Sequence, residues 1–257
     1  MGKIISFVNQ KGGVGKTTTC VNLSAFIAAS GKKTLLVDMD PQGNASSGLG
    51  VEKGTNLKTI YSVLDGECPI KEAISKTMVK NLSILPATVD LAGAEIELVA
   101  VNNREKVLKE SLAEVKDEFD FIMIDCPPSL GLLTINALSA SDTVLIPIQC
   151  EFYALEGLSQ LMNTVKLVKK HLNPDLEIEG VVMTMKDNRS NLVQQVSEQI
   201  RQYFGKKVFD TTIPRNIRLA EAPSHGVPVY LYDSKCSGAL AYRAMAEEFL
   251  KKNKRRA

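Results

Sequence analysis

The residues with the clearest chemical potential lie near the start of the chain, where residues 10–18 read Gln-Lys-Gly-Gly-Val-Gly-Lys-Thr-Thr. An apolar segment precedes them and a helical pattern follows, so Gly12, Gly13 and Gly15 stand where a strand turns into a helix. Glycines at such a turn let the backbone curl round a phosphate and direct its N–H groups inward. The sequence therefore predicts a phosphate-binding P-loop, with ATP and Mg²⁺ as its ligands.

Two lysines and a threonine of this loop have the chemistry that nucleotide hydrolysis requires. Lys16 is placed to reach the β- and γ-phosphates, and the Thr17 hydroxyl is placed to hold Mg²⁺. The usual loop has a glycine where this chain has Gln10, and an additional lysine, Lys11, follows. A second cation beside the phosphates would neutralise the charge that develops as the γ-phosphoryl group departs. We expect the nucleotide to contact Lys11, Gly12, Gly13, Val14, Gly15, Lys16, Thr17 and Thr18.

Three aspartates follow two apolar strand patterns and fit the same site. Asp125 ends the run Phe-Ile-Met-Ile-Asp, and Asp38 and Asp40 end the run Leu-Leu-Val-Asp-Met-Asp. Open parallel sheets bind their ligands at the carboxyl ends of the strands, where these residues stand. Because side chains alternate along a strand, Asp38 and Asp40 can share one side. We expect Asp38 and Asp125 to hold magnesium, Asp125 through water, and Asp40 to orient the attacking water.

Short apolar runs alternate with longer amphipathic segments along the 257 residues. Near-continuous apolar strands separated by helices predict a parallel sheet that is buried on both faces. The expected fold class is α/β: a single-domain P-loop NTPase with a mostly parallel twisted sheet covered by helices on both faces. Strands are predicted at residues 4–8, 34–38, 82–86, 121–125, 144–148 and 178–184, with a short piece near Val208. Helices are predicted at residues 17–29, 95–118, 155–172, 192–204 and 238–251.

The domain is expected to cover residues 1–250 and to be followed by a basic tail at residues 251–257, while residues 51–77 are expected to mix helix and loop. The five cysteines include no C-x-x-C pair, which argues against a disulfide framework and a zinc site and suits a reducing cytosol. No apolar run reaches the roughly 18 residues that span a bilayer. We therefore expect a soluble, cytoplasmic protein.

Taken together, these residues resemble the deviant Walker A ATPases, and within them the ParA/Soj family of chromosome- and plasmid-partition ATPases. The resemblance covers nearly the whole chain. The P-loop by itself specifies only a class of ATPase, and the later segments make the match much narrower. The segments that carry it are residues 11–18, 38–42, 125–128, 149–157, 213–216, 221–223 and 231–233.

The resemblance implies an ATP-dependent homodimer in which two subunits close face to face over both nucleotides. Lys11 would reach the phosphates of the opposite subunit, and Gly12 would lie where the two backbones approach closely. The adenine contacts of the family fall on Pro214 and Asn216, with Met185 packing nearby. The Asn216 amide has the donor and the acceptor that reading an adenine edge requires, although asparagine is also common in turns. Larger plasmid relatives carry an N-terminal helix-turn-helix extension, and the early first strand argues against operator binding here.

The resemblance also implies that the dimer binds nonspecific double-stranded DNA and that a ParB/Spo0J-type centromere-binding protein stimulates hydrolysis, which would make the protein nucleoid-associated. The net charge of the chain is only +2, so DNA binding needs a local basic surface. Residues 186–218 contain seven basic residues against three acidic ones. The family suggests Arg189 and Arg218 as DNA contacts, and Lys186 lies beside them.

Three other functions stay open at this stage. A MinD-like positioning ATPase would bind membranes through a C-terminal amphipathic helix, but the residues after Leu250 include no apolar anchor, so insertion is not expected. An iron–sulfur reductase would share a cluster through paired cysteines, yet Cys126 and Cys150 do not match that ligand pattern and read better as small buried residues. A scaffold that binds ATP without hydrolysing it is the third, and Asp40 argues against it.

Overall fold

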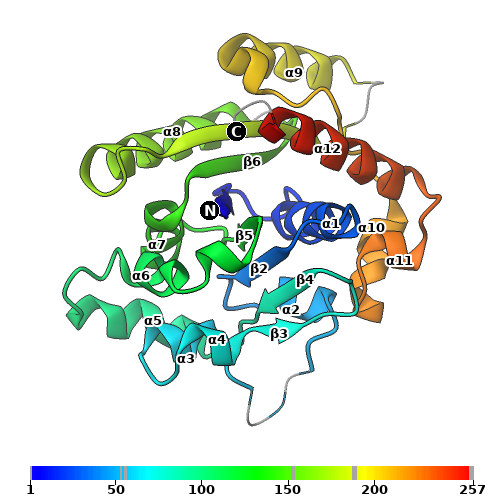
Figure 1. The fold of residues 1–257 in the computed structure, drawn as a ribbon. Coiled ribbons are helices and arrows are strands. Elements are labelled where there is room, and N and C mark those ends of the chain that lie inside the picture. Colours follow the sequence, from blue (N-terminus) through cyan, green and yellow to red (C-terminus); the bar gives the residue numbers. More distant parts are fainter. Residues whose placement is uncertain (1, 53, 55–56, 152–153, 187–189, 255–257) are drawn as a thin grey trace.

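A seven-stranded sheet forms the centre of the protein in the computed structural model, which describes residues 2–52, 54, 57–151, 154–186 and 190–254 (Figure 1). The strand order is β3-β4-β2-β5-β1-β6-β7, and every neighbouring pair is parallel except β3 with β4. The central strands are apolar on both faces because helices cover both. Their bounds are β1 Lys3–Phe7, β2 Thr34–Asp38, β3 Ser75–Lys76, β4 Leu82–Leu85, β5 Phe121–Asp125, β6 Thr143–Gln149 and β7 Glu177–Thr184.

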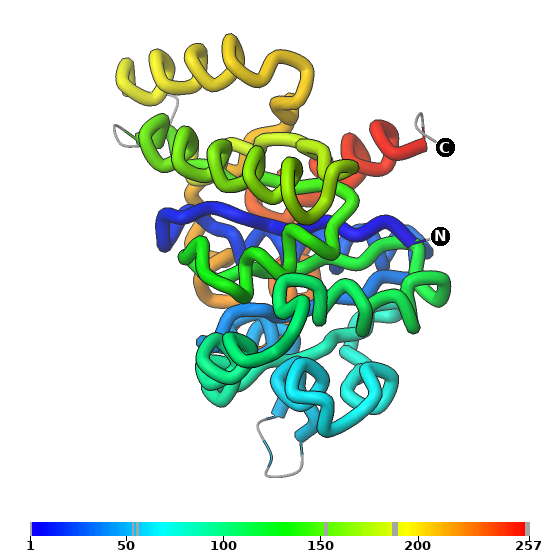
Figure 2. The backbone as a smooth tube through the Cα atoms, turned by 90° about the vertical axis from the view of Figure 1, so that its left-hand side faces the viewer, coloured from blue at the N-terminus to red at the C-terminus, as the bar shows by residue number. Residues whose placement is uncertain are grey.

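Helices pack on the two faces of the sheet and enclose two separate apolar cores. The first face is covered by α1 (Lys16–Ala29) and α12 (Ser237–Lys254), which contact each other, together with the short helices α2 (Asn44–Gly48), α10 (Ile217–Glu221) and α11 (Val229–Tyr232). The second face is covered by α3 (Ile60–Leu64), α4 (Ile70–Ala73), α5 (Leu91–Glu97), α6 (Val107–Ala113), α7 (Leu132–Ala140) and α8 (Ala154–His171). Helix α9 (Asn191–Phe204) stacks outside α8, as Figure 2 shows.

The predicted fold class and the six long strands are confirmed, and two predictions of individual elements need correction. The single helix predicted at residues 95–118 is wrong: α5 ends at Glu97, and α6 begins only at Val107. Asn103 lies between them with a φ of 55°, a left-handed conformation that asparagine tolerates in turns and that interrupts a helix. The short strand expected near Val208 is an isolated bridge to Val181.

The poorly patterned part of the chain folds as short pieces. Residues 60–76 contain α3, α4 and the two-residue strand β3, which agrees with the expected mixture of helix and loop. Helices α2, α7, α10 and α11 were not predicted, because three of them are only four or five residues long and α7 is apolar on most of its surface. Helix α12 runs to Lys254, so the first four residues of the predicted tail are helical.

A buried cluster of polar side chains joins the N-terminal strand to the C-terminal helix. The Lys3 Nζ donates hydrogen bonds to the Glu179 carboxylate at 2.5 Å and to Asn253 Oδ1 at 2.6 Å. The Asn253 amide in turn donates to the other oxygen of Glu179 at 2.9 Å. The Glu179 side chain is only 1% exposed, so its charge depends on these partners. The cluster therefore fixes α12 across the edge of the sheet.

This cluster predicts an acid-sensitive contribution to stability. Burial raises the pKa of Glu179, but Lys3 and Asn253 outweigh it and the net pKa lies below the usual value. The stabilisation is therefore present above the unfolded pKa of about 4.3 and is lost as the pH falls through the folded pKa. Glu179→Gln should lower the free energy of unfolding by about 2 kcal/mol at pH 7. Urea unfolding at pH 7 and at pH 3.5 measures the effect, which should shrink at the lower pH.

The exposed neighbour Glu177 provides the matched control. Glu177 pairs with Lys169 at the surface, with a side chain that is 58% exposed. A surface ion pair contributes little, so Glu177→Gln should change the free energy of unfolding by less than about 0.5 kcal/mol at either pH. Equal effects of the two substitutions would contradict the assigned role of the buried cluster.

Candidate nucleotide site

The loop that connects β1 to α1 has the backbone conformation that the glycines predict. Gly13 and Gly15 have φ values of 73° and 84°, in the left-handed region where a side chain is strained. Gly15 is the N-cap of α1 and offers no side-chain cap, so the N–H groups of the first turn lack such a partner. These groups and the positive end of the helix dipole face the loop, which is an arrangement that binds anions.

Neighbouring strands hold this loop in place through two polar side chains. The Thr184 hydroxyl, at the end of β7, donates a hydrogen bond to the carbonyl of Val14 at 2.7 Å. The Asn9 amide donates to the carbonyl of Pro147 in β6 at 2.7 Å, and its oxygen accepts from the Lys11 N–H at 3.0 Å. The loop is therefore tied to β6 and β7 rather than held by its own glycines alone. Sequence reasoning missed Asn9 and Thr184, because only the strand order shows that they adjoin the loop.

Lys16 lies at the centre of the site and is largely withdrawn from solvent. Its residue is 7% exposed, and the Nζ donates to the carbonyl of Lys11 at 3.3 Å, so it folds back over the loop. Burial lowers the pKa of Lys16, and the nearby Asp125 acts in the opposite direction. A phosphate group would restore a full counter-charge to this ammonium group, which makes Lys16 suited to bind one.

The parallel register brings two of the predicted carboxylates directly opposite each other. Asp38 at the end of β2 pairs with Asp125 at the end of β5, and Asp125 also pairs with Phe7, the last residue of β1. Both aspartates are fully buried. The P-loop therefore begins beside the same strand end that carries Asp125, as the strand-end argument predicts.

The two buried carboxylates differ in their partners. Asp38 accepts from the backbone N–H of Asp40 at 3.2 Å, and from the N–H and hydroxyl of Ser46 at 2.8 and 2.7 Å. Neither oxygen of Asp125 has a hydrogen-bond partner among the described residues. Burial raises the pKa of Asp38 to about 6. Burial and the charge of Asp38 raise the pKa of Asp125 well above its usual value, although Thr17 and Lys16 oppose the shift.

The difference in hydrogen bonding between Asp38 and Asp125 suits a bound divalent cation. Mg²⁺ prefers oxygen ligands and keeps several waters, and the Asp125 oxygens stand near the Thr17 hydroxyl without a partner of their own. The Asp38 oxygens also organise the turn that follows β2, through Asp40 and Ser46. Thr17 and Asp125 thus have the chemistry of a Mg²⁺ site, and Asp38 additionally holds the residues around it in place.

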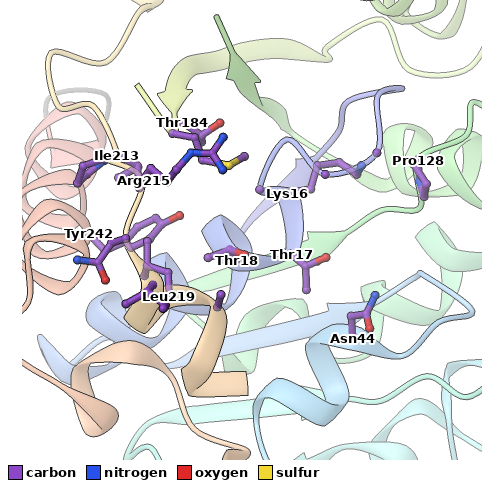
Figure 3. A pocket seen from close by; sticks show the side chains of 18 of the residues that line it. Lys16, Thr17, Thr18, Asn44, Pro128, Thr184, Ile213, Arg215, Leu219 and Tyr242 are labelled. Carbon is purple, nitrogen blue, oxygen red and sulfur yellow. The ribbon is translucent and has the colours of Figure 1, made fainter. Parts of the chain in front are cut away.

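A cavity of about 660 Å³ opens beside the P-loop (Figure 3). One end is formed by the loop and by Asp40, whose Oδ1 accepts from the Gln42 N–H at 2.9 Å. The other end is mainly apolar. The residues at that end are Met185, Ile213, Pro214, Ile217, Leu219, Ala220 and Tyr242, with Thr184, Arg215 and Asn216 among them. Phosphates at the loop and a base among the apolar side chains would match this distribution.

Pro214 and Asn216, the predicted adenine contacts, both line the cavity. Asn216 is also the N-cap of α10: its oxygen accepts from the Arg218 N–H at 2.8 Å. Its amide nitrogen donates to the Ser237 hydroxyl at 2.8 Å. Both functional groups of this side chain therefore have protein partners, and the turn role considered from the sequence applies to it as well.

Lys11 does not line the cavity but points outward from the loop. Its Nζ forms an ion pair with Glu151, and the two side chains are 41% and 45% exposed. Gly12, beside it, has nothing within 4 Å of the position that a Cβ would occupy. This outer end of the loop is therefore open to another molecule.

Two of the predicted DNA contacts, Lys186 and Arg218, belong to the described residues, and their surroundings differ. Lys186 lines a smaller cavity of about 210 Å³, together with Glu151 and Arg215. Arg218 is compensated by Glu221, at 2.8 Å, and by Asp233, at 3.7 Å. Arg189 lies outside the described residues.

The remaining basic residues of the segment lie on another part of the molecule. Arg201 and Lys206 are exposed at the end of α9, and Lys207 there donates to the carbonyl of Ile178 at 2.6 Å. Figures 1 and 2 both place α9 at the upper edge of the molecule, with α10 below it. The basic segment therefore extends over several surfaces.

Comparisons with known proteins identify relatives along nearly the whole chain. A family model described as an AAA domain (AAA_31) matches residues 2–178. The sporulation initiation inhibitor protein Soj of Bacillus subtilis (strain 168) is 60% identical over 248 residues, which are 96% of this chain and 98% of that protein. The chromosome-partitioning ATPase Soj of Treponema pallidum (strain Nichols) is 54% identical over the full length of both chains.

A similar solved structure contains ligands of the expected kind. The crystal structure of cobyrinic acid a,c-diamide synthase from Mycobacterium smegmatis, with a bound ATP analogue and magnesium, has a TM-score of 0.86 at 35% identity. It covers 99% of this chain and 96% of its own. The fold and the loop define a P-loop ATPase of the deviant Walker A class. Within that class, the chain belongs to the ParA/Soj family of chromosome-partitioning ATPases.

Substitution of Asp125 should make the nucleotide-free protein more stable and should weaken its response to Mg²⁺. Asp125→Asn removes the cost of burying an ionisable carboxyl group opposite Asp38, so the nucleotide-free variant should melt at a higher temperature, by about 2–4 °C for each 1 kcal/mol gained. The same change should abolish most of the additional thermal stabilisation that Mg²⁺ gives to the ATP-bound protein. Thermal melts with ATP, with and without Mg²⁺, measure both effects. The exposed residue Asp65 provides a control, and Asp65→Asn should leave both unchanged. A retained Mg²⁺ effect in Asp125→Asn would exclude Asp125 from the metal site.

Proposed function

We propose that the protein is an ATP-dependent molecular switch for chromosome or plasmid segregation. ATP and Mg²⁺ bind in the cavity, two subunits close over the nucleotides, and the dimer binds nonspecific double-stranded DNA of the nucleoid. A ParB/Spo0J-type centromere-binding partner then stimulates hydrolysis, and the monomers leave the DNA. The observation that carries the proposal is a P-loop with two lysines, one buried inside the site and one directed outward.

The hydrolytic roles follow from where each side chain lies. Lys16 binds the phosphates from the buried side of the loop, and Thr17, Asp38 and Asp125 are the residues that would hold Mg²⁺. Bound Mg²⁺ would neutralise phosphate charge. Asp40 is 7% exposed and lines the cavity next to the loop, which suits a carboxylate that orients a water against the γ-phosphate.

The dimer is supported by the outer end of the loop. Lys11 does not line the cavity of its own chain. Its Nζ forms an ion pair with Glu151, and this pair is exposed to solvent. Such a pair contributes little, so a phosphate group on a second subunit can replace it. A side chain at position 12 would meet no atom of the described residues, so nothing there requires a glycine. A glycine at this position would instead allow another backbone to approach closely.

DNA binding is supported by charge rather than by a preformed patch. Arg201 and Lys206 are exposed, and Lys186 borders the small cavity near Lys11 and Glu151. We propose Lys186, Arg189 and Arg218 as contacts, with Arg218 exchanging Glu221 and Asp233 for phosphate. Two copies of this surface in a dimer would bind more tightly than one without any new contact.

The position of α12 in the fold argues against membrane binding through this C-terminal helix. Tyr242, Met245 and Phe249 are almost completely buried on α12 and form part of the core beneath it. Asn253 further attaches the end of this helix to Glu179. A helix whose apolar face is already packed has little to insert into lipid. No helix among the described residues is long and apolar enough to cross a membrane. Because the apolar face of α12 is already packed, the MinD-like alternative is less favoured than DNA binding.

The other two alternatives conflict with the positions of single residues. Cys126 and Cys150 are 0% and 2% exposed within the apolar core, where they cannot share a cluster with a second subunit without unfolding their surroundings. A scaffold without hydrolysis would have no use for a carboxylate at the phosphate end of the cavity, where Asp40 lies. Both positions favour an ATPase switch.

Asp40→Ala tests the switch directly. The variant should bind ATP but hydrolyse it at least about 100-fold more slowly, because it lacks the group that orients water. It should therefore accumulate on DNA. Fluorescence anisotropy of a random-sequence duplex, with ATP–Mg²⁺ against ADP–Mg²⁺ at two salt concentrations, measures this. Binding should be at least about tenfold tighter with ATP and should weaken steeply with salt.

The controls distinguish a loss of ATP binding from a loss of hydrolysis or of DNA binding. Lys16→Ala should bind neither ATP nor DNA, because it lacks the ammonium group that holds the phosphates. Normal turnover by Asp40→Ala would remove Asp40 from catalysis. An ATP-bound dimer with no affinity for DNA in either state would overturn the segregation proposal, and anionic vesicles would then be the next ligand to test.

Lys11 and Glu151 separate contacts within one chain from contacts between two chains. Lys11→Ala should weaken ATP-dependent dimerisation and hydrolysis at least about tenfold while ATP still binds the monomer. Glu151→Ala breaks the same ion pair but leaves Lys11 free, so that variant should dimerise at least as well as the wild type. Sedimentation equilibrium with ATP and Mg²⁺ measures both. Equal losses in the two variants would mean that the ion pair itself matters and would contradict a role of Lys11 in the opposite subunit.

A further inference from the structure

Arg215 lies in the nucleotide cavity and has no assigned role. It belongs to the basic segment that suggests DNA binding, yet it lines both the 660 Å³ cavity and the adjoining 210 Å³ cavity. Figure 3 shows its side chain beside Thr184, which holds the P-loop. The residue is exposed, and its guanidinium group has no hydrogen bond or ion pair among the described residues.

The contrast with Arg218, three residues later, is informative. Arg218 is engaged by Glu221 and by Asp233 and does not line either cavity. Arg215 is therefore an uncompensated cation in a cavity, whereas Arg218 is a compensated one on the surface. A free guanidinium group beside a ligand site is available to the ligand without breaking any contact.

The part of the cavity that Arg215 occupies is the part that suits a base. The phosphate-binding loop forms one end, and Ile213, Pro214, Leu219 and Tyr242 contribute apolar surface at the other. Met185 is brought into this end by a left-handed backbone, with a φ of 48°, a conformation that is costly for methionine. A flat apolar ligand group would pack here and leave its open face toward Arg215.

The Asn216 amide already takes part in two hydrogen bonds within the protein. Its oxygen accepts from the Arg218 N–H, and its nitrogen donates to the Ser237 hydroxyl, which leaves one donor hydrogen and one lone pair for a base. A planar guanidinium group can instead stack on an aromatic ring and needs no acceptor in a fixed position.

We propose that Arg215 is a nucleotide-binding residue whose guanidinium group stacks on the purine base of ATP, and that it is not part of the DNA-binding surface. The inference rests on the proposed ATP site. It assigns one arginine of the basic segment to the nucleotide and leaves the proposed DNA contacts Lys186, Arg189 and Arg218 unchanged.

The test compares three ligands by isothermal titration calorimetry on the full chain with Mg²⁺. Arg215→Ala should bind ATP and ADP about fivefold more weakly, by the same factor for both, because both carry the base. It should bind inorganic tripolyphosphate like the wild type, because that ligand has none. Arg215→Lys should not restore ATP affinity, since an ammonium group does not stack as a planar guanidinium does.

The controls use an arginine outside the site and a measurement of folding. Arg243 is exposed on α12 and lies over the Phe26 ring, 5.9 Å from its centroid, so Arg243→Ala should leave all three affinities unchanged. Melting curves without nucleotide establish that each variant folds. With saturating ATP, Arg215→Ala should bind the DNA duplex like the wild type.

Each alternative outcome overturns the inference in a different way. Unchanged ATP affinity with weaker DNA binding would return Arg215 to the DNA surface. Weaker tripolyphosphate binding, or a loss confined to ATP, would make Arg215 a phosphate contact rather than a base contact. If the wild type bound no ATP at all, the proposed function itself would fail, and this result is distinct from the others.

Discussion

The site depends on the parallel register of three neighbouring strands. β2, β5 and β1 end at the same edge of the sheet, and this register places Asp38 directly opposite Asp125 next to the start of the P-loop. Two fully buried carboxylates facing each other are unfavourable, because both lose hydration and the charge of Asp38 raises the pKa of Asp125. Asp38 is stabilised by Ser46 and the Asp40 N–H, but Asp125 has no such partner among the described residues. The fold therefore keeps at this edge a carboxyl group whose ionised form a bound cation would stabilise.

The rest of the site holds this edge in a fixed geometry. Asn9 and Thr184 tie the loop to β6 and β7, and Asp38 ties the turn after β2 to its own strand. These contacts join segments that are far apart in the sequence and attach the loop to the sheet. Rigid positioning matters for phosphoryl transfer, because its catalysis is mostly placement and charge stabilisation.

The sequence predicted those features that local patterns determine. The strands were predictable because Phe121–Asp125 and Thr34–Asp38 are apolar apart from residues at their ends, and the P-loop because its glycines stand between a strand and a helix. The break between α5 and α6 was not predicted, because one left-handed asparagine, Asn103, interrupts a segment whose flanks are good helix formers. The roles of Thr184 and Arg215 could not be predicted either. Both depend on which strand lies beside the loop, and short patterns carry no information about such distant neighbours.

The distribution of charge gives a reason why two subunits of the proposed dimer would close only over bound nucleotide. In the single chain, Lys11 is compensated by Glu151 and Arg218 by Glu221, so each of these two cations already has an anion of its own chain. Both pairs are exposed, and exposed pairs are weak enough to be exchanged for phosphate groups without a large penalty. The buried groups Lys16 and Asp125 behave differently, because each needs a counter-charge that the described residues supply only in part. A nucleotide with its metal ion would satisfy the buried groups first and then present phosphate oxygens that the outward lysine of a second subunit can reach. If two subunits close over the nucleotides as proposed, nucleotide would therefore bind before the partner subunit.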